Sequence, residues 1–474
     1  MLRHGSIGPM STPTPAGLHT GAAVRVASAA SLGGFLFGFD SAVINGAVPG
    51  IEASFHAGSA GTGFAVASIL LGCAAGAWFA GRLADRIGRR RLMLLTGLVF
   101  ALTALWTGWV GSVGAFNLAR FLSGMAVGAA SVVSPAYIAE IAPPALRGRL
   151  SALNQMGVVL GIFVALLSDD VIAAWAGGIS APFWLGLEGW RWMFLVELLP
   201  ALLLMAAALW LPESPRHLVA TGREAEALAV MRRFDGGVGP AQIEAIRATF
   251  AQAHAPRLRD LLDGHGRLLP LVWTGIALSC LQQLVGINVI FYYGTTLWKA
   301  VGFATGDSLA INILSGAINI AATLVAIALI DRIGRRPLLL WGAVGMTLTL
   351  SLLALALSMA HTDAAGHVAL PAPWGLVALL AANAYVFAFG VSWGPAVWTL
   401  LGEMFPNRLR GSALAVAVTA QWLANWLVTV SFPPLLRGLG PAVAYALYAG
   451  FAALAVVFVM RRVQETRGRA LEDM

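Results

Sequence analysis

The residues best suited to chemistry in this sequence are three ionisable side chains inside long apolar stretches, Asp40, Arg120 and Glu197. Asp40 lies near the middle of Gly33 to Val48, a stretch that is otherwise almost wholly apolar. If this stretch crosses a bilayer, a charged side chain within it costs about 2.5–3.5 kcal/mol, so an acid there indicates a function. Glu197 is harder to interpret, because its place in FLVELLP could simply face a polar seam.

Arg120 is the natural partner for Asp40. A nearby guanidinium favours the ionised form of a buried carboxyl group, whereas protonation of that group releases the arginine. The pair therefore predicts a two-state switch through which a proton gradient could drive a change of conformation. The alternative is a static ion pair that orients two helices.

Uncharged polar side chains form a second group within apolar stretches. Gln421 and Asn425 share a helix face, and Gln282 and Tyr293 are close to three turns apart on another helix. Amides and phenols offer donors and acceptors without net charge, and indole rings offer flat apolar faces, which suits a sugar better than an ion. The alternative is that the amides join helices and the tryptophans lie at membrane interfaces. The candidate substrate-binding residues are Gln155, Gln282, Gln283, Asn288, Tyr292, Asn319, Trp393, Gln421, Trp422 and Asn425.

The composition indicates the elements that must position these groups. The chain has 474 residues, of which 58% are hydrophobic and 11% charged, whereas a soluble domain is about 25% charged. We therefore expect an all-α polytopic membrane protein with twelve transmembrane helices. They lie near 24–48, 62–82, 92–112, 115–138, 152–174, 190–211, 271–298, 308–330, 338–360, 374–402, 412–436 and 440–460.

The loop charges predict the orientation. By the predicted spans, 26 of the 30 basic residues lie in the tails and in the loops on one side of the membrane. This bias places both termini and the central loop in the cytoplasm, and it explains the sequence pI of 10.3 without a nucleic-acid partner. Cys73 and Cys280 lie inside apolar runs and are expected to be core residues rather than a disulfide or metal site.

Short charged patterns occur twice, six spans apart. The first set is Asp85, Arg89, Glu140, Arg147, Glu213 and Arg216, and the second is Asp331, Arg335, Glu403 and Arg410. The repeat predicts two parallel, pseudo-symmetric bundles of six helices, with a substrate site between them. At the cytoplasmic span ends, the paired charges predict a network that clamps that side shut. The alternative for any single arginine is a purely topological role.

These features predict five segments. Residues 1–22 form a disordered cytoplasmic tail, 23–211 the N-terminal six-helix bundle and 212–268 a cytoplasmic linker with amphipathic helices. Residues 269–461 form the C-terminal six-helix bundle and 462–474 a cytoplasmic tail. The polar start gives no usual signal peptide, and Met10 could be the true start.

Several longer motifs resemble the sugar porter family of the major facilitator superfamily, and among its members the bacterial xylose–proton symporters and related glucose transporters. They are GRLADRIGRRR (81–91), RFLSGMAVGAASVVSPAYIAEIAPPALRGRL (120–150), PESPR (212–216), QQLVGINVIFYY (282–293), DRIGRRP (331–337), SWGPAVWTLLGEMFP (392–406) and QWLANW (421–426). The resemblance covers nearly the whole chain. It implies that the ten candidate residues named above line a sugar pocket, and that Asp40 and Arg120 couple sugar to proton entry.

The sequence departs from the resembled pattern at one pocket position. Where xylose symporters carry a second glutamine, seven residues after Gln155, this chain has Ile162. This makes xylose doubtful as the substrate and leaves glucose, galactose, another monosaccharide or a polyol open. Phe37 and Phe39 match aromatic positions beside the pocket.

The resulting hypothesis is secondary active transport of a monosaccharide by alternating access, coupled to proton symport. The alternatives are an uncoupled facilitative transporter and, less favoured, a non-transporting sugar sensor. We expect neither an enzyme nor a bound cofactor or metal, because no nucleotide loop, metal cluster or nucleophile–histidine pair is evident. The expected setting is the cell membrane, with a monomer in the lipid bilayer and a proton gradient as the driving force.

Overall fold

The computed structural model describes residues 20–56, 58–142, 147–234, 239–252, 258–263, 265–362, 368–405 and 407–465. Within these ranges, twelve helical segments are long and apolar enough to cross a membrane, which confirms the predicted all-α polytopic fold. Of the two predicted tails, positions 1–19 and 466–474 lie outside the described residues.

The N-terminal half contains the first six spans. Span one is divided into three consecutive helices and span six into two, whereas the other four are continuous. The helices are α1 (Thr20–Ala30), α2 (Leu32–Ala42), α3 (Ile44–Phe55), α4 (Ser59–Ile87), α5 (Arg89–Trp109), α6 (Val113–Ile141), α7 (Arg147–Ala176), α8 (Gly189–Leu195) and α9 (Leu198–Trp210). A short 3-10 helix, η2 (Trp184–Gly186), precedes α8.

The C-terminal half contains the other six spans and follows a linker. The linker contains α10 (Pro215–Ala220), α11 (Glu224–Arg232), α12 (Pro240–Gln252) and the 3-10 helix η3 (Leu258–Leu261). The half itself contains α13 (Pro270–Leu284), α14 (Ile287–Ala300), α15 (Thr305–Ile333), α16 (Arg335–Ser358), α17 (Ala372–Val391), α18 (Trp393–Met404), α19 (Asn407–Gly438) and α20 (Gly440–Arg462). Two short antiparallel strands, β1 (His361–Thr362) and β2 (Val368–Ala369), lie between α16 and α17.

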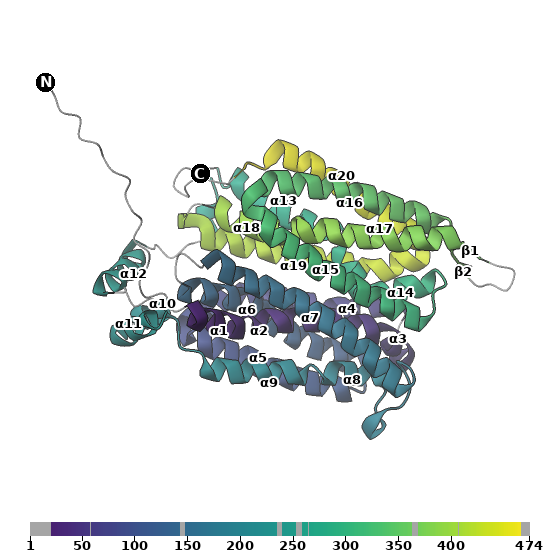
Figure 1. Ribbon diagram of the computed structural model, residues 1–474, viewed down its shortest axis with the longest axis horizontal. Coiled ribbons are helices and arrows are strands. Elements are labelled where there is room, and N and C mark those ends of the chain that lie inside the picture. Colours follow the sequence, from purple (N-terminus) through teal and green to yellow (C-terminus); the bar gives the residue numbers. More distant parts are fainter. Residues whose placement is uncertain are drawn as a thin grey trace.

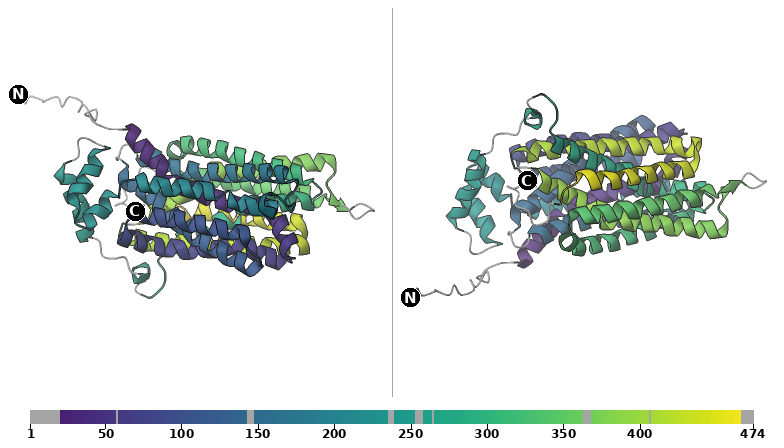
Figure 2. Two further views of the ribbon diagram at one scale, coloured as in Figure 1. Left: turned by 90° about the horizontal axis from the view of Figure 1, so that it is seen from below. Right: turned by 90° about the horizontal axis from the view of Figure 1, so that it is seen from above.

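The two halves lie side by side with their helices along the long axis of the molecule, purple to blue for the first and green to yellow for the second (Figure 1). Helices α10–α12 gather at one end, which we call the linker end, and α3, α8, α14 and the strand pair lie at the opposite end. The views in Figure 2 agree with this arrangement. Along the seam between the halves, α4 packs on α19, α7 on α15 and α3 on α14. The linker helices have a small core of their own, Leu218, Val219, Ala227 and Ile243.

Glycines allow helices within the N-terminal half to approach backbone to backbone. A Cβ atom built on Gly72 or Gly76 of α4 would lie 2.0 Å or 2.1 Å from a carbonyl oxygen of α6. The reverse holds for Gly124 of α6, whose Cβ atom would lie 2.0 Å from the Ile69 oxygen. Small residues at such crossings are the usual means of packing helices in lipid, where van der Waals contact replaces the hydrophobic effect as the driving force.

Span seven is interrupted between α13 and α14, near the seam. Gly286 adopts φ +81°, a conformation that glycine reaches without the steric penalty of other residues. A Cβ atom there would also lie 2.6 Å from the Tyr448 ring. A second irregularity follows at Tyr293, whose φ of −126° and ψ of 16° are not helical. Span seven therefore consists of segments that can bend relative to one another.

Span ten is interrupted at Ser392. Gly390 and the Gly394–Pro395 pair are the helix-weakening residues of this span, and the break lies between them: α17 ends at Val391 and α18 begins at Trp393. Pro395 therefore lies in the first turn of α18, where its missing N–H removes no intrahelical hydrogen bond. The proline begins a second helical segment and does not kink a continuous helix.

The α4–α6 crossing makes a testable prediction about stability. Gly76→Val should lower the melting temperature of the purified protein sharply, because the added methyl groups would overlap the Met125 backbone. The cost should lie at or above the upper end of the roughly 1–3 kcal/mol usual for overpacking. Gly81→Val in the same helix is the matched control, since a Cβ atom there meets nothing within 4 Å. Equal melting temperatures for the two variants would contradict the prediction.

Candidate functional site

Asp40 and Arg120 form a fully buried ion pair between α2 and α6. Their side chains are 0% and 2% exposed. Arg120 Nη1 donates to Asp40 Oδ1, Arg120 Nη2 donates to the Asp40 carbonyl oxygen at 3.0 Å, and Ser123 Oγ donates to Asp40 Oδ2 at 2.9 Å. Both carboxylate oxygens thus have a donor, which is what stabilises a charge that has lost its water. The predicted partnership is present.

Two further groups surround this pair. The guanidinium carbon of Arg120 lies 5.2 Å from the centre of the Phe194 ring, within cation–π range. Glu197 is 2% exposed and lies close enough to Asp40 and Arg120 to interact with both, and its Oε1 has no hydrogen-bond partner among the described residues. Glu197 therefore belongs to the same buried cluster, which its position in the sequence left open.

A cavity of about 120 Å³ lies between the two halves. Nine of the ten candidate substrate-binding residues line it, Gln155 from α7 and the others from the C-terminal half: Gln282, Gln283, Asn288, Tyr292, Asn319, Gln421, Trp422 and Asn425. Gly38 and Ser41 of α2 line it as well, on either side of Asp40 in the sequence. The cavity and the ion pair therefore share one helix.

Hydrogen bonds hold the amides of span seven in place. Gln282 Nε2 donates to the Trp393 carbonyl oxygen at 2.8 Å, and Asn288 Nδ2 donates to Gln283 Oε1 at 2.7 Å. On α19, by contrast, Gln421 Oε1 and Trp422 Nε1 are buried without a partner among the described residues. One acceptor and one donor at the cavity wall are thus left for a bound molecule, since buried polar atoms are normally satisfied.

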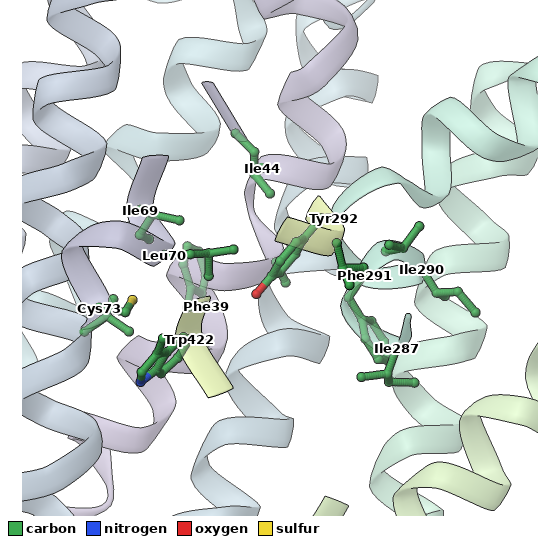
Figure 3. Packing of buried hydrophobic residues seen from close by; sticks show 14 of the residues in the cluster. Phe39, Ile44, Ile69, Leu70, Cys73, Ile287, Ile290, Phe291, Tyr292 and Trp422 are labelled. Atoms are coloured by element: carbon green, nitrogen blue, oxygen red, sulfur yellow. The ribbon is translucent and has the colours of Figure 1, made fainter. Parts of the chain in front are cut away.

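Aromatic side chains complete the cavity wall. The Phe37 and Trp422 rings meet edge to face across the seam, with centroids 5.6 Å apart. Trp422 and Tyr292 from the C-terminal half belong to the same buried apolar cluster as Phe39 and Leu70 of the N-terminal half (Figure 3). Flat apolar rings next to uncharged donors and acceptors are the complement of a polyhydroxylated ring, which has C–H faces and a polar rim.

Trp393 is the one candidate that does not line the cavity. It is fully buried, and its Nε1 donates to the Leu339 carbonyl oxygen of α16 at 2.9 Å. Its role at the site is indirect, since only its carbonyl oxygen meets the cavity residue Gln282. Trp398, five residues later, supplies the cavity wall instead, together with Phe389 from the other side of the helix break.

At the opposite end, an amide of the N-terminal half enters the irregular part of α14. Asn45 Nδ2 donates to the Phe291 carbonyl oxygen at 3.0 Å, and Asn45 Oδ1 accepts from Thr295 N at 2.9 Å and from Asn312 Nδ2 at 3.1 Å. Asn45 thus satisfies backbone groups that the break at Tyr293 leaves exposed. We call Asn45, Thr295 and Asn312 the asparagine latch. An exposed ion pair, Arg437 to Glu52 at 2.9 Å, joins the halves at the same end.

The repeated charges of the first half form one network at the linker end. Arg89 contacts Asp85 at 2.9 Å and Glu140 at 3.0 Å. Glu213 Oε1 accepts from the backbone N–H groups of Arg89 at 2.9 Å and of Ser214 at 2.8 Å. Because Arg89 begins α5, the Glu213 carboxylate also lies at a helix N-terminus, where negative charge is favoured.

The second half repeats this network. Arg335 contacts Glu403 at 2.8 Å, and Glu465 accepts from the backbone N–H groups of Arg335 and Arg336, each at 3.0 Å. Glu465 follows the twelfth span as Glu213 follows the sixth, so the sequence repeat pairs these two acids. All of these contacts lie within one half, so in this conformation each network braces its own half.

The remaining predicted members of the network are placed as follows. Arg216 is exposed on α10 in the linker. The side chains of Arg147, Asp331 and Arg410 lie outside the described residues.

Comparison with known proteins agrees with this geometry. The model of the family "Sugar (and other) transporter" matches residues 26–474. The chain belongs to this sugar transporter family. It is 49% identical to the "Glucose transport protein" of Synechocystis sp., over 98% of this chain and 100% of that one. It is 36% identical to the "D-xylose-proton symporter" of Escherichia coli, over 94% of this chain and 93% of the other.

The fold agrees as well. The inward-open conformation of the xylose transporter XylE from E. coli superposes with a TM-score of 0.80 at 34% identity, over 95% of this chain and 98% of that one. The protein is therefore a multi-pass sugar transporter of the major facilitator fold and not an enzyme.

Because Trp398 lines the cavity and Trp393 does not, substitutions of these two residues should have different effects on transport. Trp398→Leu should raise the KM for a transported sugar roughly fivefold, because it removes an aromatic face from the cavity wall. Trp393→Phe should leave the KM within about a factor of two and lower the melting temperature, because it removes the hydrogen bond to Leu339. Initial rates of labelled-sugar uptake into proteoliposomes, with melting curves of the same preparations, measure both. A raised KM in Trp393→Phe together with an unchanged KM in Trp398→Leu would mean that Trp393 contacts the sugar.

Proposed function

We propose that this sugar transporter is a monosaccharide–proton symporter that works by alternating access. The observation that supports the coupling is the buried Asp40–Arg120 pair, because it combines a titratable carboxyl group with a guanidinium inside a membrane span. A group in this position can bind and release one proton per cycle if it becomes accessible to each side in turn.

The chemistry of the switch follows from its hydrogen bonds. In this conformation the Asp40 carboxylate accepts from Arg120 and from Ser123. Protonation of the carboxyl group removes its negative charge and converts one acceptor into a donor, so the attraction to Arg120 is lost. Glu197 is the neighbouring group that can then pair with the guanidinium. Loss and recovery of the Asp40–Arg120 bond would shift α2 relative to α6.

The shared helix provides a route from the proton to the sugar. Gly38 and Ser41 line the cavity, and Asp40 lies between them on α2. A movement of α2 that follows protonation therefore alters the cavity wall, and a sugar bound against α2 alters the environment of Asp40. Such mutual dependence between two sites is what coupling requires.

We further propose that the linker end faces the cytoplasm of a cell membrane and that this conformation opens inward. The arginine bias of the loops supports the orientation. The asparagine latch and the Arg437–Glu52 pair, which join the halves at the opposite end, support closure on the outer side. The likeness to an inward-open solved structure supports the same view.

For the substrate, the cavity favours a hexose such as glucose over xylose. Gln155, Val158, Val159 and Ile162 line the cavity from α7, so that helix presents one amide and three apolar side chains. The relative that is 49% identical is named a glucose transport protein, and the xylose–proton symporter is the more distant at 36%.

An uncoupled facilitative transporter is the second candidate. The name of the more similar relative mentions glucose transport without a proton, and a buried ion pair can also have a purely structural role. In proteoliposomes with an imposed proton gradient, a symporter accumulates sugar and loses the accumulation when an ionophore collapses the gradient. Concentrative uptake that survives the ionophore would exclude coupling to protons.

Asp40→Asn provides the direct test of the switch. The amide cannot exchange a proton, so accumulation of sugar should fall to the equilibrium level while sugar exchange across the membrane continues. Asp307→Asn, in an exposed acid at the start of α15, is the control and should accumulate sugar normally. Unchanged accumulation by Asp40→Asn would refute the coupling role of Asp40.

Ile162→Gln provides the test of substrate preference. A second amide on α7 adds a donor and an acceptor to the cavity, so the ratio of kcat/KM for xylose to that for glucose should rise roughly fivefold, as expected for one additional hydrogen bond. Ile162→Met, which changes the shape without adding either group, should leave the ratio unchanged. A rise in both variants would assign the effect to shape.

A further inference from the structure

Besides Asp40 and Glu197, a third acid, Asp169, is buried in the N-terminal half, and no basic side chain among the described residues forms an ion pair with it. It lies on α7 and is 0% exposed. Its Oδ2 accepts a hydrogen bond from the backbone N–H of Gly46 at 3.1 Å, and its Oδ1 has no partner within the described part of the chain. An acidic side chain in such a place is costly, so the structure must gain something from it.

The position of Gly46 indicates what is gained. Gly46 is the third residue of α3, which begins at Ile44 after the interruption of span one at Val43. The first turn of a helix leaves backbone N–H groups without an intrahelical acceptor, and a carboxyl oxygen there also interacts favourably with the helix dipole. Asp169 thus acts as a cap for α3 that is supplied by a different helix.

The fit between the two helices is close. A Cβ atom on Gly46 would lie 2.7 Å from the Asp169 Cβ atom and 2.7 Å from its Oδ2 atom. The absence of a side chain at Gly46 therefore lets the carboxyl group reach the backbone. The capped N–H belongs to the residue that directly follows Asn45, the centre of the asparagine latch.

Asn45 has strict geometric requirements. Its amide donates to the Phe291 carbonyl oxygen and accepts from the Thr295 backbone N–H and from both the Thr295 hydroxyl group and Asn312. These bonds cross from the N-terminal to the C-terminal half. A small rotation or shift of α3 would break several of them together, since hydrogen bonds weaken steeply with poor geometry.

We propose that Asp169 is a positioning residue for alternating access: through its bond to Gly46 N it fixes the start of α3 so that Asn45 can close the latch to α14. The proposal rests on the alternating access proposed above. It assigns Asp169 no contact with sugar and no part in the Asp40–Arg120 switch. Asp169 instead affects the equilibrium between two conformations, one closed and one open at the end opposite the linker.

The experiment measures that equilibrium without any sugar. Thr62 of α4 is 1% exposed and lies at the opposite end, in the seam beside Phe432 and Pro433. In a background with Cys73→Ser and Cys280→Ser, Thr62→Cys reports opening of this end through its rate of reaction with a bulky maleimide. Purified protein in detergent exposes both ends to the reagent, so the orientation in a membrane does not enter.

In that background, Asp169→Ala should raise the labelling rate roughly fivefold. Loss of one ordinary hydrogen bond raises the population of the open conformation by about this factor, and the labelling rate follows that population. Asp169→Asn keeps an oxygen that can accept from Gly46 N, so its rate should stay within about a factor of two of the parent. Asp170→Ala, in the adjacent acid of the same helix, is the matched control and should not change the rate. Should Asp169→Ala not yield folded protein, Asp169→Ser, whose hydroxyl group is too short to reach Gly46, takes its place with the same expectation.

A double-mutant cycle separates positioning from a general loss of packing. Asn45→Ala should raise the labelling rate as Asp169→Ala does, and the two together should raise it no further, because both act through one latch. The proposal is overturned if Asp169→Ala leaves the rate unchanged, if Asp169→Asn opens as far as Asp169→Ala, or if the two effects multiply. Failure of sugar uptake by the parent protein would refute the proposed function and leave this result intact.

Discussion

A bilayer offers no water to a buried polar group, so each such group in this transporter must find its partner inside the protein. The chain meets this constraint differently in its two halves. The N-terminal half contains the buried charges, with Asp40, Arg120 and Glu197 in one cluster. The C-terminal half presents uncharged amides and phenols to the cavity. A neutral molecule can therefore bind and leave one half while the titratable groups remain protected in the other.

The same constraint explains where the helices are interrupted. A break in a transmembrane helix exposes N–H and C=O groups that only a neighbouring segment can satisfy. Asn45 satisfies backbone groups around the irregular Tyr293, and Gln282 donates to the carbonyl oxygen of Trp393, the first residue after the break in span ten. Asp169 likewise satisfies the backbone N–H of Gly46 at the start of α3. The interrupted spans one, seven and ten thus contribute to the cavity wall and to the closure, and the bonds of Asn45 to α14 join the two halves.

The sequence is sufficient for the architecture and for most of the cavity. Span length and hydropathy predict twelve helices, and the repeated charges predict the two halves. Nine cavity residues follow from their polarity within apolar runs. Trp393 is placed differently from the other candidates: after the break at Ser392 its ring packs on α16, where Nε1 donates to the Leu339 carbonyl oxygen. The repeat also identifies Glu465, since it follows the sixth span of its half as Glu213 does.

Asn45 and Asp169 could not have been predicted in this way. Their partners are backbone groups more than a hundred residues away, and a single sequence contains no record of which helix a polar side chain will meet. Asp169 precedes Asp170 near the end of a span, where paired acids usually mark a solvated loop. Only the close approach of α7 to the glycine at position 46 gives it a buried partner.

The strength of contacts within and between the halves determines how the transporter can move. Inside the N-terminal half, glycines bring backbones of α4 and α6 into direct contact, and the linker-end network ties α5 to α4, α6 and the linker. Interlocked backbones are stiff, so protonation of Asp40 cannot be absorbed by loosening the half as a whole. Helix α2 is interlocked in the same way with α7, where a Cβ atom on Gly38 would lie 1.9 Å from the Val158 carbonyl oxygen. The joint available to α2 is therefore Val43, where span one is divided and α3 begins. The buried Asp40 on α2 and the latch on α3 are then two parts of one jointed span. This geometry allows a change of charge at Asp40 to affect the closure made by the latch.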